Sequence, residues 1–305
     1  MSESEFGYIK WLQTYLKYGK EVLVGSGDDC AVVKLPDGKL LYSTTDTIVE
    51  GIDFWPSNAT PKQIGYKSAA VSLSDLAAMG VEYSSIYALI SASLPKKFAR
   101  PPFTHPLFKG MHFACKRFGV QIIGGDLSIT RGPITITSTL LGISKSKPVT
   151  RLGAQPGDAI LVTGKLGGSI LGRHLCFTPR LRESGLLSRR YKITSMIDIS
   201  DGLLQDLNHI LEKSKVGAVL DEISIPISWD AYKLKGSALR HALTDGEDFE
   251  LLFTAPFEEA IKIRKDKTIK TPISVIGLIT KEKGISILSR QGKIIKVKPE
   301  GYRHF

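Results

Sequence analysis

The segment at residues 61–80, PKQIGYKSAAVSLSDLAAMG, restricts the fold more than any other part of the sequence. Pro61 and Gly80 are typical start and stop residues and predict a helix between them. Apolar residues lie on every side of this helix, so we expect it to be largely buried. Asp75 stands in its middle, and no basic residue follows within a turn. Because an unpaired buried carboxylate is very costly, a metal ion or a distant arginine has to balance the charge of Asp75.

Strands and helices alternate on both sides of this segment. In the first half of the chain, apolar and β-branched runs bounded by turn residues predict four strands. These strands span residues 39–46, 84–95, 119–126 and 133–144. Further helices are expected at the start of the chain and near residues 104–118. The first half is therefore predicted to be a mixed α/β unit.

The turn QPGD at residues 155–158 marks the start of a second unit, and we predict two domains, 1–147 and 148–305. Strands in the second domain are expected at 159–164, 194–200, 216–220, 249–255, 272–279 and 284–290. Helices are expected at 167–175, 201–214, 228–235 and 256–266. This pattern again indicates mixed α/β structure.

Further acidic residues stand at the ends of apolar strands or next to small residues. They are Asp28, Asp29, Asp46, Asp126, Asp198 and Asp201. Loops at the carboxyl ends of strands gather into active sites in α/β folds. Each aspartate taken alone is better explained as a turn or N-cap residue. The recurrence of the pattern favours a shared site.

The ligand chemistry of these acids indicates magnesium. Oxygen ligands without nearby His or Cys favour Mg²⁺ over zinc or copper, and Mg²⁺ usually shares the phosphates of a substrate. Glycine turns such as IIGGD and VTGKLGGS let backbone N–H groups approach phosphate oxygens. The residues themselves therefore predict a Mg²⁺-dependent enzyme that acts on a phosphate compound, and they do not name the substrate.

The positive charge of the chain has two interpretations. The formal net charge is +11, and between Lys262 and Lys298 only Asp266 and Glu282 are acidic. Such a region could bind nucleic acid or an anionic membrane, or it could be a solvated face that aids the capture of anionic metabolites. The sequence contains no helix-turn-helix, zinc-finger or aromatic-interleaved basic pattern, so we expect no nucleic-acid partner.

Neither a membrane segment nor a disulfide framework is expected. No run approaches about 18 apolar residues, and the N-terminus lacks the apolar core of a signal peptide. Cys30, Cys115 and Cys176 are far apart and show no metal-binding spacing. A reducing, cytoplasmic location is therefore expected.

Several long motifs give the chain a resemblance to thiamine-monophosphate kinases. In order, they are GSGDDCAVV, STTDTIVEGIDF, IGYKSAAVSLSDLAAMG, IIGGD, RLGAQPGDAILVTGKLGGS, PRLRESGLL, IDISDGLLQDLNHI and DGEDFELLFT. The resemblance covers about residues 25–255, and EGYRHF matches the ending of the family. It implies the two-domain fold of aminoimidazole ribonucleotide synthetase. It also implies a homodimer in which the sheets of the N-terminal α/β domains pair across the dimer, each followed by a C-terminal α+β domain.

The resemblance also implies an activity and a set of site residues. The activity is ATP- and Mg²⁺-dependent phosphorylation of thiamine monophosphate to thiamine diphosphate by direct in-line transfer, with several Mg²⁺ ions and no catalytic side chain. The implied metal ligands are Asp29, Thr44, Thr45, Asp46, Asp75, Asp126, Asp198 and Asp201. The implied ATP contacts are Gly125, Asp126, Arg151 and Ser200. Glu247 is the implied substrate contact.

Three positions depart from the family pattern on the acceptor side. Asp53 stands where members commonly carry a histidine that faces the substrate, and Asp245 replaces the first glycine of GGEDYEL. Pro299 stands where members often have an aromatic residue that packs on the thiamine. We include Asp53 and Pro299 with Glu247 as candidate substrate contacts, and Asp53 could pair with the cationic thiazolium ring.

Two alternatives remain open. The first is a related superfamily enzyme or a member with a different acceptor. The sequence lacks the reactive N-terminal Cys of selenophosphate synthetases, the C-terminal Cys of hydrogenase-maturation members and the TDGVGTK-like segment of aminoimidazole ribonucleotide synthetase. The second is a non-catalytic protein that binds nucleotide or thiamine phosphate. The complete set of acidic residues argues against it, because binding alone would not need every metal ligand.

Overall fold

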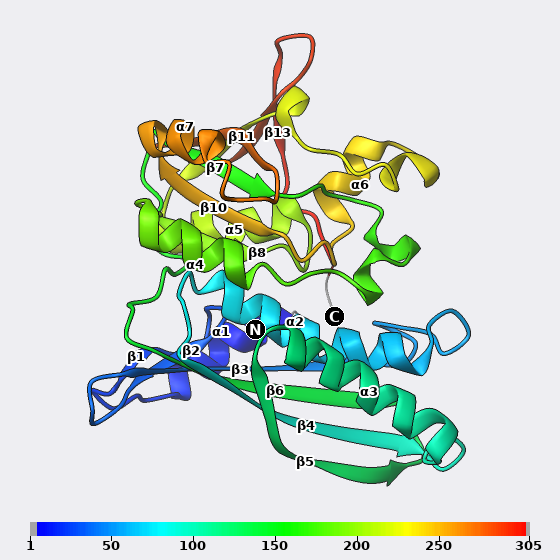
Figure 1. Cartoon of the computed structure of the whole chain (residues 1–305). Coiled ribbons are helices and arrows are strands. Elements are labelled where there is room, and N and C mark those ends of the chain that lie inside the picture. Colours follow the sequence, from blue (N-terminus) through cyan, green and yellow to red (C-terminus); the bar gives the residue numbers. More distant parts are fainter. Residues whose placement is uncertain (1–4, 303–305) are drawn as a thin grey trace.

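The computed structural model describes residues 5–302 and contains two sheets, one above the other in Figure 1. The first sheet has the strand order β1-β2-β3-β6-β4-β5. Its strands are β1 (Val22–Val24), β2 (Ala31–Lys34), β3 (Leu40–Val49), β4 (Ser85–Pro95), β5 (Val120–Thr130) and β6 (Thr135–Ser144). The helices of this half are α1 (Glu5–Tyr15), α2 (Pro61–Ala78) and α3 (Pro101–Arg117). All its pairs are antiparallel except β4 with β5.

The second sheet has the order β13-β12-β9-β11-β7-β10-β8. Its strands are β7 (Asp158–Thr163), β8 (Ser195–Asp198), β9 (Gly217–Asp221), β10 (Leu251–Pro256), β11 (Ile273–Thr280), β12 (Gly284–Leu288) and β13 (Ile294–Val297). The helices of this half are α4 (Leu181–Arg190), α5 (Leu203–Ser214), α6 (Ala238–Thr244) and α7 (Phe257–Lys265). The mixed α/β fold predicted from the sequence is confirmed.

Both faces of the second sheet are covered near its centre. Successive side chains of a strand point to opposite faces, and all six residues of β7 are buried. On one face Ile160 belongs to the buried cluster that includes Leu207 of α5, and on the other Leu161 belongs to the cluster that includes Ile263 of α7. The sheet is therefore a rigid central layer from which the loops at the strand ends project.

Helix α2 lies between the two sheets (Figure 1) and is as buried as its composition predicts. Every residue from Ile64 to Ser74 is buried, whereas Asp75 is only partly so. The helix begins with a capping box, in which the Thr60 side chain accepts from the Gln63 N–H and the Gln63 side chain accepts from the Thr60 N–H. This central position explains why α2 is apolar on all sides, since it packs against strands of the first half and against α4 and β8 of the second.

Two of the predicted helices do not form, so these two predictions are wrong. The range 167–175 forms two 3₁₀ turns, η1 (Ser169–Leu171) and η2 (Arg173–Leu175), separated by Gly172 at a φ of 124°. The range 228–235 contains only the 3₁₀ turn η4 (Ala231–Lys233). Glycines with positive φ at 167, 168 and 172 interrupt the first segment, because this conformation cannot continue an α-helix. A further 3₁₀ turn is η3 (Glu222–Ser224).

Some elements were not expected from the sequence. These are the short strands β1, β2 and β13 and the helices α4 and α6. In the part of the chain that the structure describes, no helix combines the length and the apolarity needed to cross a bilayer.

Candidate active site

Three carboxylates from different elements meet where the two halves of the chain face each other. Oxygen atoms of Asp29, Asp75 and Asp198 all lie within 4.8 Å of one another. Asp29 lies in the loop before β2, Asp75 on α2 and Asp198 at the end of β8. Asp46 is electrostatically coupled to the same group. The structure thus brings together four of the aspartates singled out in the sequence.

Hydrogen bonds fix these carboxylates without neutralising them. Ser74 Oγ donates to Asp198 Oδ2 over 2.6 Å, and Thr44 Oγ1 donates to Asp75 Oδ2. Arg151 Nη2 donates to Asp29 Oδ1 over 2.5 Å. The other oxygen of Asp29, and Oδ2 of Asp46, are buried and have no hydrogen-bond partner among the described residues.

The electrostatics of the group are unfavourable in the absence of a cation. Burial raises the pKa of Asp198 to about 7, and the charge of Asp29 adds to this effect. Burial, followed by repulsion from Asp46 and Asp198, raises the pKa of Asp75 well above its ordinary value. Arg151 is one positive charge among four carboxylates, and it pairs with Asp29. Buried like charges in this number require further positive charge.

The donor set fits Mg²⁺. Every candidate atom is a carboxylate or hydroxyl oxygen, the ligand type that Mg²⁺ prefers, and two of the carboxylate oxygens are buried without a hydrogen-bond partner in residues 5–302. In this group the oxygens that would hold Mg²⁺ belong to Asp29, Thr44, Asp46, Asp75 and Asp198.

Thr45 and Asp126 lie on the other face of the first sheet. Thr45 Oγ1 is 3.0 Å from Thr139 Oγ1 on this face, where Thr47 likewise contacts Thr137. Thr47 pairs with Thr137 of β6, Thr137 pairs with Ser91 of β4, and Ser91 pairs with Asp126 of β5. Asp126 therefore lies on the same face of the sheet as Thr47. Because Thr47 follows Asp46 in β3, the two side chains point to opposite faces. Asp46 also lies three strand spacings, about 14 Å, from the residue at the same level in β5, because β6 and β4 stand between the two strands. Asp126 therefore lies outside the carboxylate group of its own chain.

Gly125, the neighbour of Asp126, has a φ of 154°. A Cβ atom at this position would lie 1.8 Å from the carbonyl oxygen of Ile90. Only glycine fits here, which accounts for the IGGD motif on structural grounds whatever its role toward ATP.

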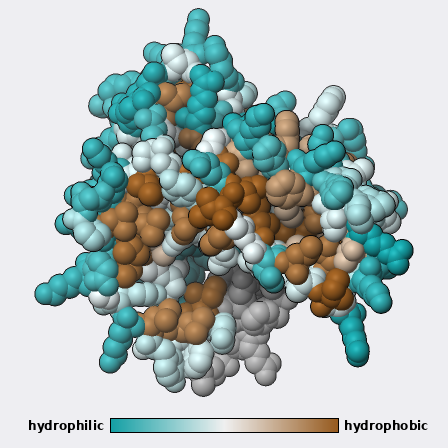
Figure 2. Space-filling view, turned by 60° about the horizontal axis from the view of Figure 1, so that its bottom comes forward, coloured by the Kyte–Doolittle hydropathy of each residue, from teal (hydrophilic) through white to brown (hydrophobic). Residues whose placement is uncertain are grey.

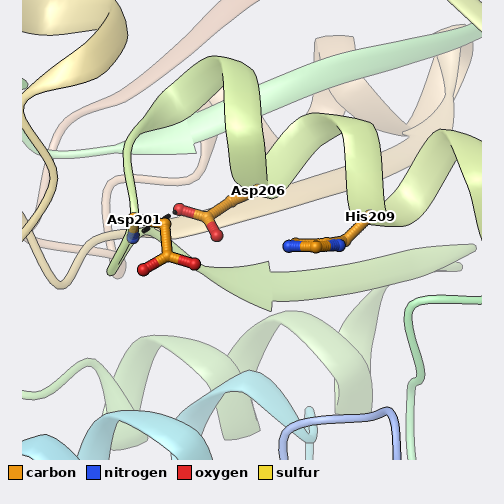
Figure 3. Close-up of side chains that lie close together, drawn as sticks. All are labelled: Asp201, Asp206 and His209. Carbon is orange, nitrogen blue, oxygen red and sulfur yellow. Dashed lines mark hydrogen bonds between the residues drawn. The ribbon is translucent and has the colours of Figure 1, made fainter. Parts of the chain in front are cut away.

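A second acidic group lies at the start of α5 (Figure 3). Ligand atoms of Asp201, Asp206 and His209 lie within 4.8 Å of one another. Asp206 Oδ2 accepts from the N–H groups of Asp201 and Gly202 over 3.1 and 3.0 Å. Burial raises the pKa of Asp206 and lowers that of His209 to about 4. The sequence singled out only Asp201. The structure shows that Asp206 holds the turn that carries it.

A cavity of about 550 Å³ adjoins both acidic groups. Asp46, Ser200 and Asp201 line it, so it is continuous with the predicted phosphate end of the site. Its other walls are lined by Asp53, Trp55, Lys67, Ile170, Asp245, Glu247, Phe249 and Tyr302. Carboxylates and aromatic rings together suit a flat, positively charged ligand.

The three departures from the family pattern fall in different places. Asp53 lines the cavity, and its Oδ2 accepts from the Val49 N–H over 2.7 Å. Asp245 also lines the cavity and pairs with His241 Nδ1 over 2.9 Å. The hydrogen bond with Asp245, and then that with the Lys235 carbonyl, raise the pKa of His241. Pro299 lines two other hollows, whereas Tyr302 is the C-terminal residue at the cavity. The motif EGYRHF could have pointed to Tyr302.

Lys67 was missed in the sequence. Its side chain is fully buried, yet it reaches the cavity wall and forms an ion pair with Glu247. A lysine inside the apolar segment IGYKSAAVSL was the available signal, since such a lysine needs a buried partner.

Each half of the chain matches a family model over most of its sheet. The model of the AIR synthase related protein N-terminal domain matches residues 27–144, and that of the C-terminal domain matches residues 168–289. A thiamine-monophosphate kinase of Rhodopirellula baltica is 37% identical over 98% of this chain and 97% of its own length. The Escherichia coli K12 thiamine-monophosphate kinase is 35% identical over 93% of each chain.

Solved structures agree with these relatives. The AaThiL structure complexed with AMPPCP and TMP superimposes with a TM-score of 0.84 and 30% identity. The match covers 99% of this chain and 97% of that chain.

Proposed function

Because the chain belongs to the thiamine-monophosphate kinase family of AIR synthase related proteins, we propose that it transfers the γ-phosphoryl group of ATP to thiamine monophosphate, giving thiamine diphosphate and ADP. It is an ATP-dependent phosphotransferase with a phosphate group as acceptor. The observation that carries this function is the continuity between the buried carboxylates and the cavity, which share Asp46.

The chemistry needs little from individual side chains. The attacking oxygen belongs to a phosphate that is already ionised near neutral pH, so no strong general base is required. The main obstacle is repulsion between two anionic phosphates. Bound Mg²⁺ would neutralise and orient the phosphate oxygens. Asp29, Asp46, Asp75 and Asp198 hold their oxygens ready for it, because Ser74, Thr44 and Arg151 fix three of the four.

The nucleotide side is assigned to residues near this group. Arg151 can make charge-assisted hydrogen bonds to phosphate, and its contact with Asp29 keeps the guanidinium next to the carboxylates. Ser200 lines the cavity beside Asp201. We place Gly125 and Asp126 at the nucleotide as well, but in the site of the opposite protomer.

A homodimer is proposed because the edge strand β5 is open. Ile123, Leu127 and Ile129 are 56%, 63% and 61% exposed. Figure 2, in which the lower side of Figure 1 comes forward, shows several apolar patches on this side of the molecule. A second copy covering this strand and the hydroxyl-lined face beside it would bury these side chains.

Two further assignments accompany the activity. The division into domains 1–147 and 148–305 is supported by the two sheets, whose strands lie at 22–144 and 158–297. A cytoplasmic location is supported by three free cysteines, of which Cys176 is exposed.

The test is a product assay. The protein is incubated with ATP, Mg²⁺ and thiamine monophosphate, and thiamine diphosphate is measured by chromatography. A Mg²⁺-dependent product that is lost in Asp46→Asn and kept in Asp37→Asn, an exposed aspartate, supports the kinase. Bound ATP without product would instead indicate a different acceptor, and a screen of phosphorylated metabolites would follow.

A further inference from the structure

The Lys67 ammonium is the only fully buried cationic side chain among the ion pairs of the described residues. It sits on α2, a helix that is buried over most of its length. Its Nζ donates to the carbonyl oxygen of Asp53 over 2.7 Å and to Glu247 Oε1. A buried charge of this kind is tolerated only when it is paired and hydrogen-bonded, so these contacts are obligatory.

Glu247 is held in an unusual backbone conformation. Its φ is +52°, and Phe249 two residues later has a φ of +50°. Residues other than glycine rarely adopt this left-handed backbone conformation, and such strain persists where surrounding contacts impose it. The Glu247 N–H donates to the Ser200 carbonyl over 2.7 Å, and Ser169 Oγ donates to the Glu247 carbonyl over 2.7 Å. The backbone is thus fixed at both of its polar groups.

The side chain of Glu247 has one cationic neighbour and one open side. It is 27% exposed and lines the 550 Å³ cavity, with Lys67 on its buried side. Burial raises the pKa of Glu247, and the charge of Lys67 opposes that rise. Lys67 therefore favours the ionised carboxylate and turns one of its oxygens inward, which leaves the other available to the cavity.

We propose that Lys67 is a positioning residue for the acceptor: by pairing with Glu247 and binding the Asp53 carbonyl, it fixes both carboxylate-bearing walls of the cavity against the cationic, hydrogen-bond-donating end of the substrate. This inference rests on the proposed function, because the acceptor is thiamine monophosphate. Lys67 acts through Glu247 and the 50–54 turn, while the phosphoryl end of the site lies at Asp46 and Asp201.

The experiment measures binding and turnover separately. Dissociation constants for thiamine monophosphate and for a non-hydrolysable ATP analogue are measured by calorimetry, and KM and kcat by product assay. The variants are Lys67→Met, Glu247→Gln and the double variant. Lys62→Met is the matched control, since Lys62 is an exposed lysine on the same helix. Circular dichroism establishes that each variant is folded.

Lys67→Met is expected to raise the Kd and KM for thiamine monophosphate at least tenfold and to leave the Kd of the ATP analogue within twofold. Glu247→Gln is expected to have a similar effect. The Kd of the double variant for thiamine monophosphate should be no higher than that of the more severe single variant, because Lys67 acts through Glu247. Lys62→Met should match the wild type.

An unchanged acceptor Kd in folded Lys67→Met overturns the proposal, as does an equal loss of affinity for both ligands. If Lys67→Met does not fold, Lys67→Arg takes its place, because a planar guanidinium cannot reproduce both contacts. An unchanged acceptor Kd in Lys67→Arg then overturns the proposal in the same way. Failure of the wild type to bind thiamine monophosphate would instead refute the proposed function.

Discussion

Ser74 on α2 donates a 2.6 Å hydrogen bond to Asp198 at the end of β8, and both side chains are buried. This single contact joins the first half of the chain to the second inside the carboxylate group. Because α2 lies between the two sheets (Figure 1), it carries Ser74, Asp75 and Lys67 to the second half. This largely buried helix therefore also supplies polar groups to the site.

Ser74→Ala should lower the free energy of unfolding by about 1.5–3 kcal/mol in urea titrations, because it removes a hydrogen bond to a buried carboxylate. Ser68→Ala is the matched control on the same helix. Ser68 Oγ donates to the Gly65 carbonyl over 2.9 Å, a neutral contact, and its loss should be about 1 kcal/mol. An equal loss in the two variants would contradict the special role of the Ser74 contact.

Mg²⁺ should stabilise the wild type and not Asp75→Asn. A ligand that binds only the folded state at about 100 times its Kd adds about 2.7 kcal/mol, which thermal unfolding detects as a rise in Tm. Without Mg²⁺, Asp75→Asn should be at least as stable as the wild type, because it removes repulsion from Asp46 and Asp198. Asp37→Asn, at an exposed turn, should keep the full Mg²⁺ response. A Mg²⁺-dependent rise of Tm in Asp75→Asn equal to that of the wild type would contradict this assignment.

His174 should make the protein sensitive to acid. Burial, and then the charge of Lys67, lower its pKa from 6.5 to about 4. The unfolded chain therefore binds a proton on His174 between pH 6.5 and 4 when the folded chain does not. Stability from this group is complete above pH 6.5 and falls as the pH drops toward 4, by up to about 3 kcal/mol.

His174→Gln removes this group while keeping a donor for the Ser169 carbonyl, which His174 Nδ1 contacts over 2.8 Å. Urea titrations at several pH values should then show a flatter decline below pH 6.5. The exposed His105 provides the control, and His105→Gln should keep the wild-type slope. Parallel pH profiles for wild type and His174→Gln would count against this explanation.

Mixed dimers should test whether the site is shared between subunits. Asp46→Asn and Asp126→Asn are each expected to be nearly inactive. If the partner's Asp126 serves the site of Asp46, co-refolded mixtures should regain about a quarter of wild-type activity, because half the dimers carry one intact site. Inactive mixtures that still form mixed dimers would show that each chain builds its site alone.

The edge strand can be tested independently of catalysis. Leu127→Asp places a charge among the exposed apolar residues of β5 and should shift the protein from dimer to monomer in sedimentation velocity. The exposed Leu152→Asp lies outside this strand and should leave the oligomeric state unchanged. A dimer that survives Leu127→Asp would point to a different interface.

The sequence predicted the chemistry of the site better than its geometry. Asp75 was recognisable because a carboxylate in an all-apolar helix needs a partner, and the structure supplies Thr44 and two further carboxylates. The opposite faces of Thr45 and Asp46 follow from strand alternation, but which face meets the helices depends on how the sheets pack. Asp126 was placed by its motif, and the register that separates it from Asp46 spans three strand pairs that no local pattern fixes.

The sequence also did not reveal which buried polar groups pair with one another. The apolar run around Lys67 indicates that this lysine needs a buried partner, but the partner, Glu247, lies 180 positions away and no local pattern identifies it. Asp206 resembled an ordinary helix residue, and only the folded turn shows it binding the N–H groups of residues 201 and 202. Such pairings depend on tertiary contacts, so neither composition nor spacing reveals them.

Asp53→Asn should weaken the binding of thiamine monophosphate without affecting ATP. Asparagine keeps an oxygen for the Val49 N–H, so the turn is retained while the negative charge in the cavity is lost. Loss of one charge opposite a cationic ring should raise the acceptor KM roughly tenfold, equivalent to about 1.4 kcal/mol. Asp53→Ala also removes the turn contact and should raise KM further. An unchanged KM in Asp53→Asn would mean that Asp53 serves the turn alone, and that the charge facing the thiazolium comes from Glu247.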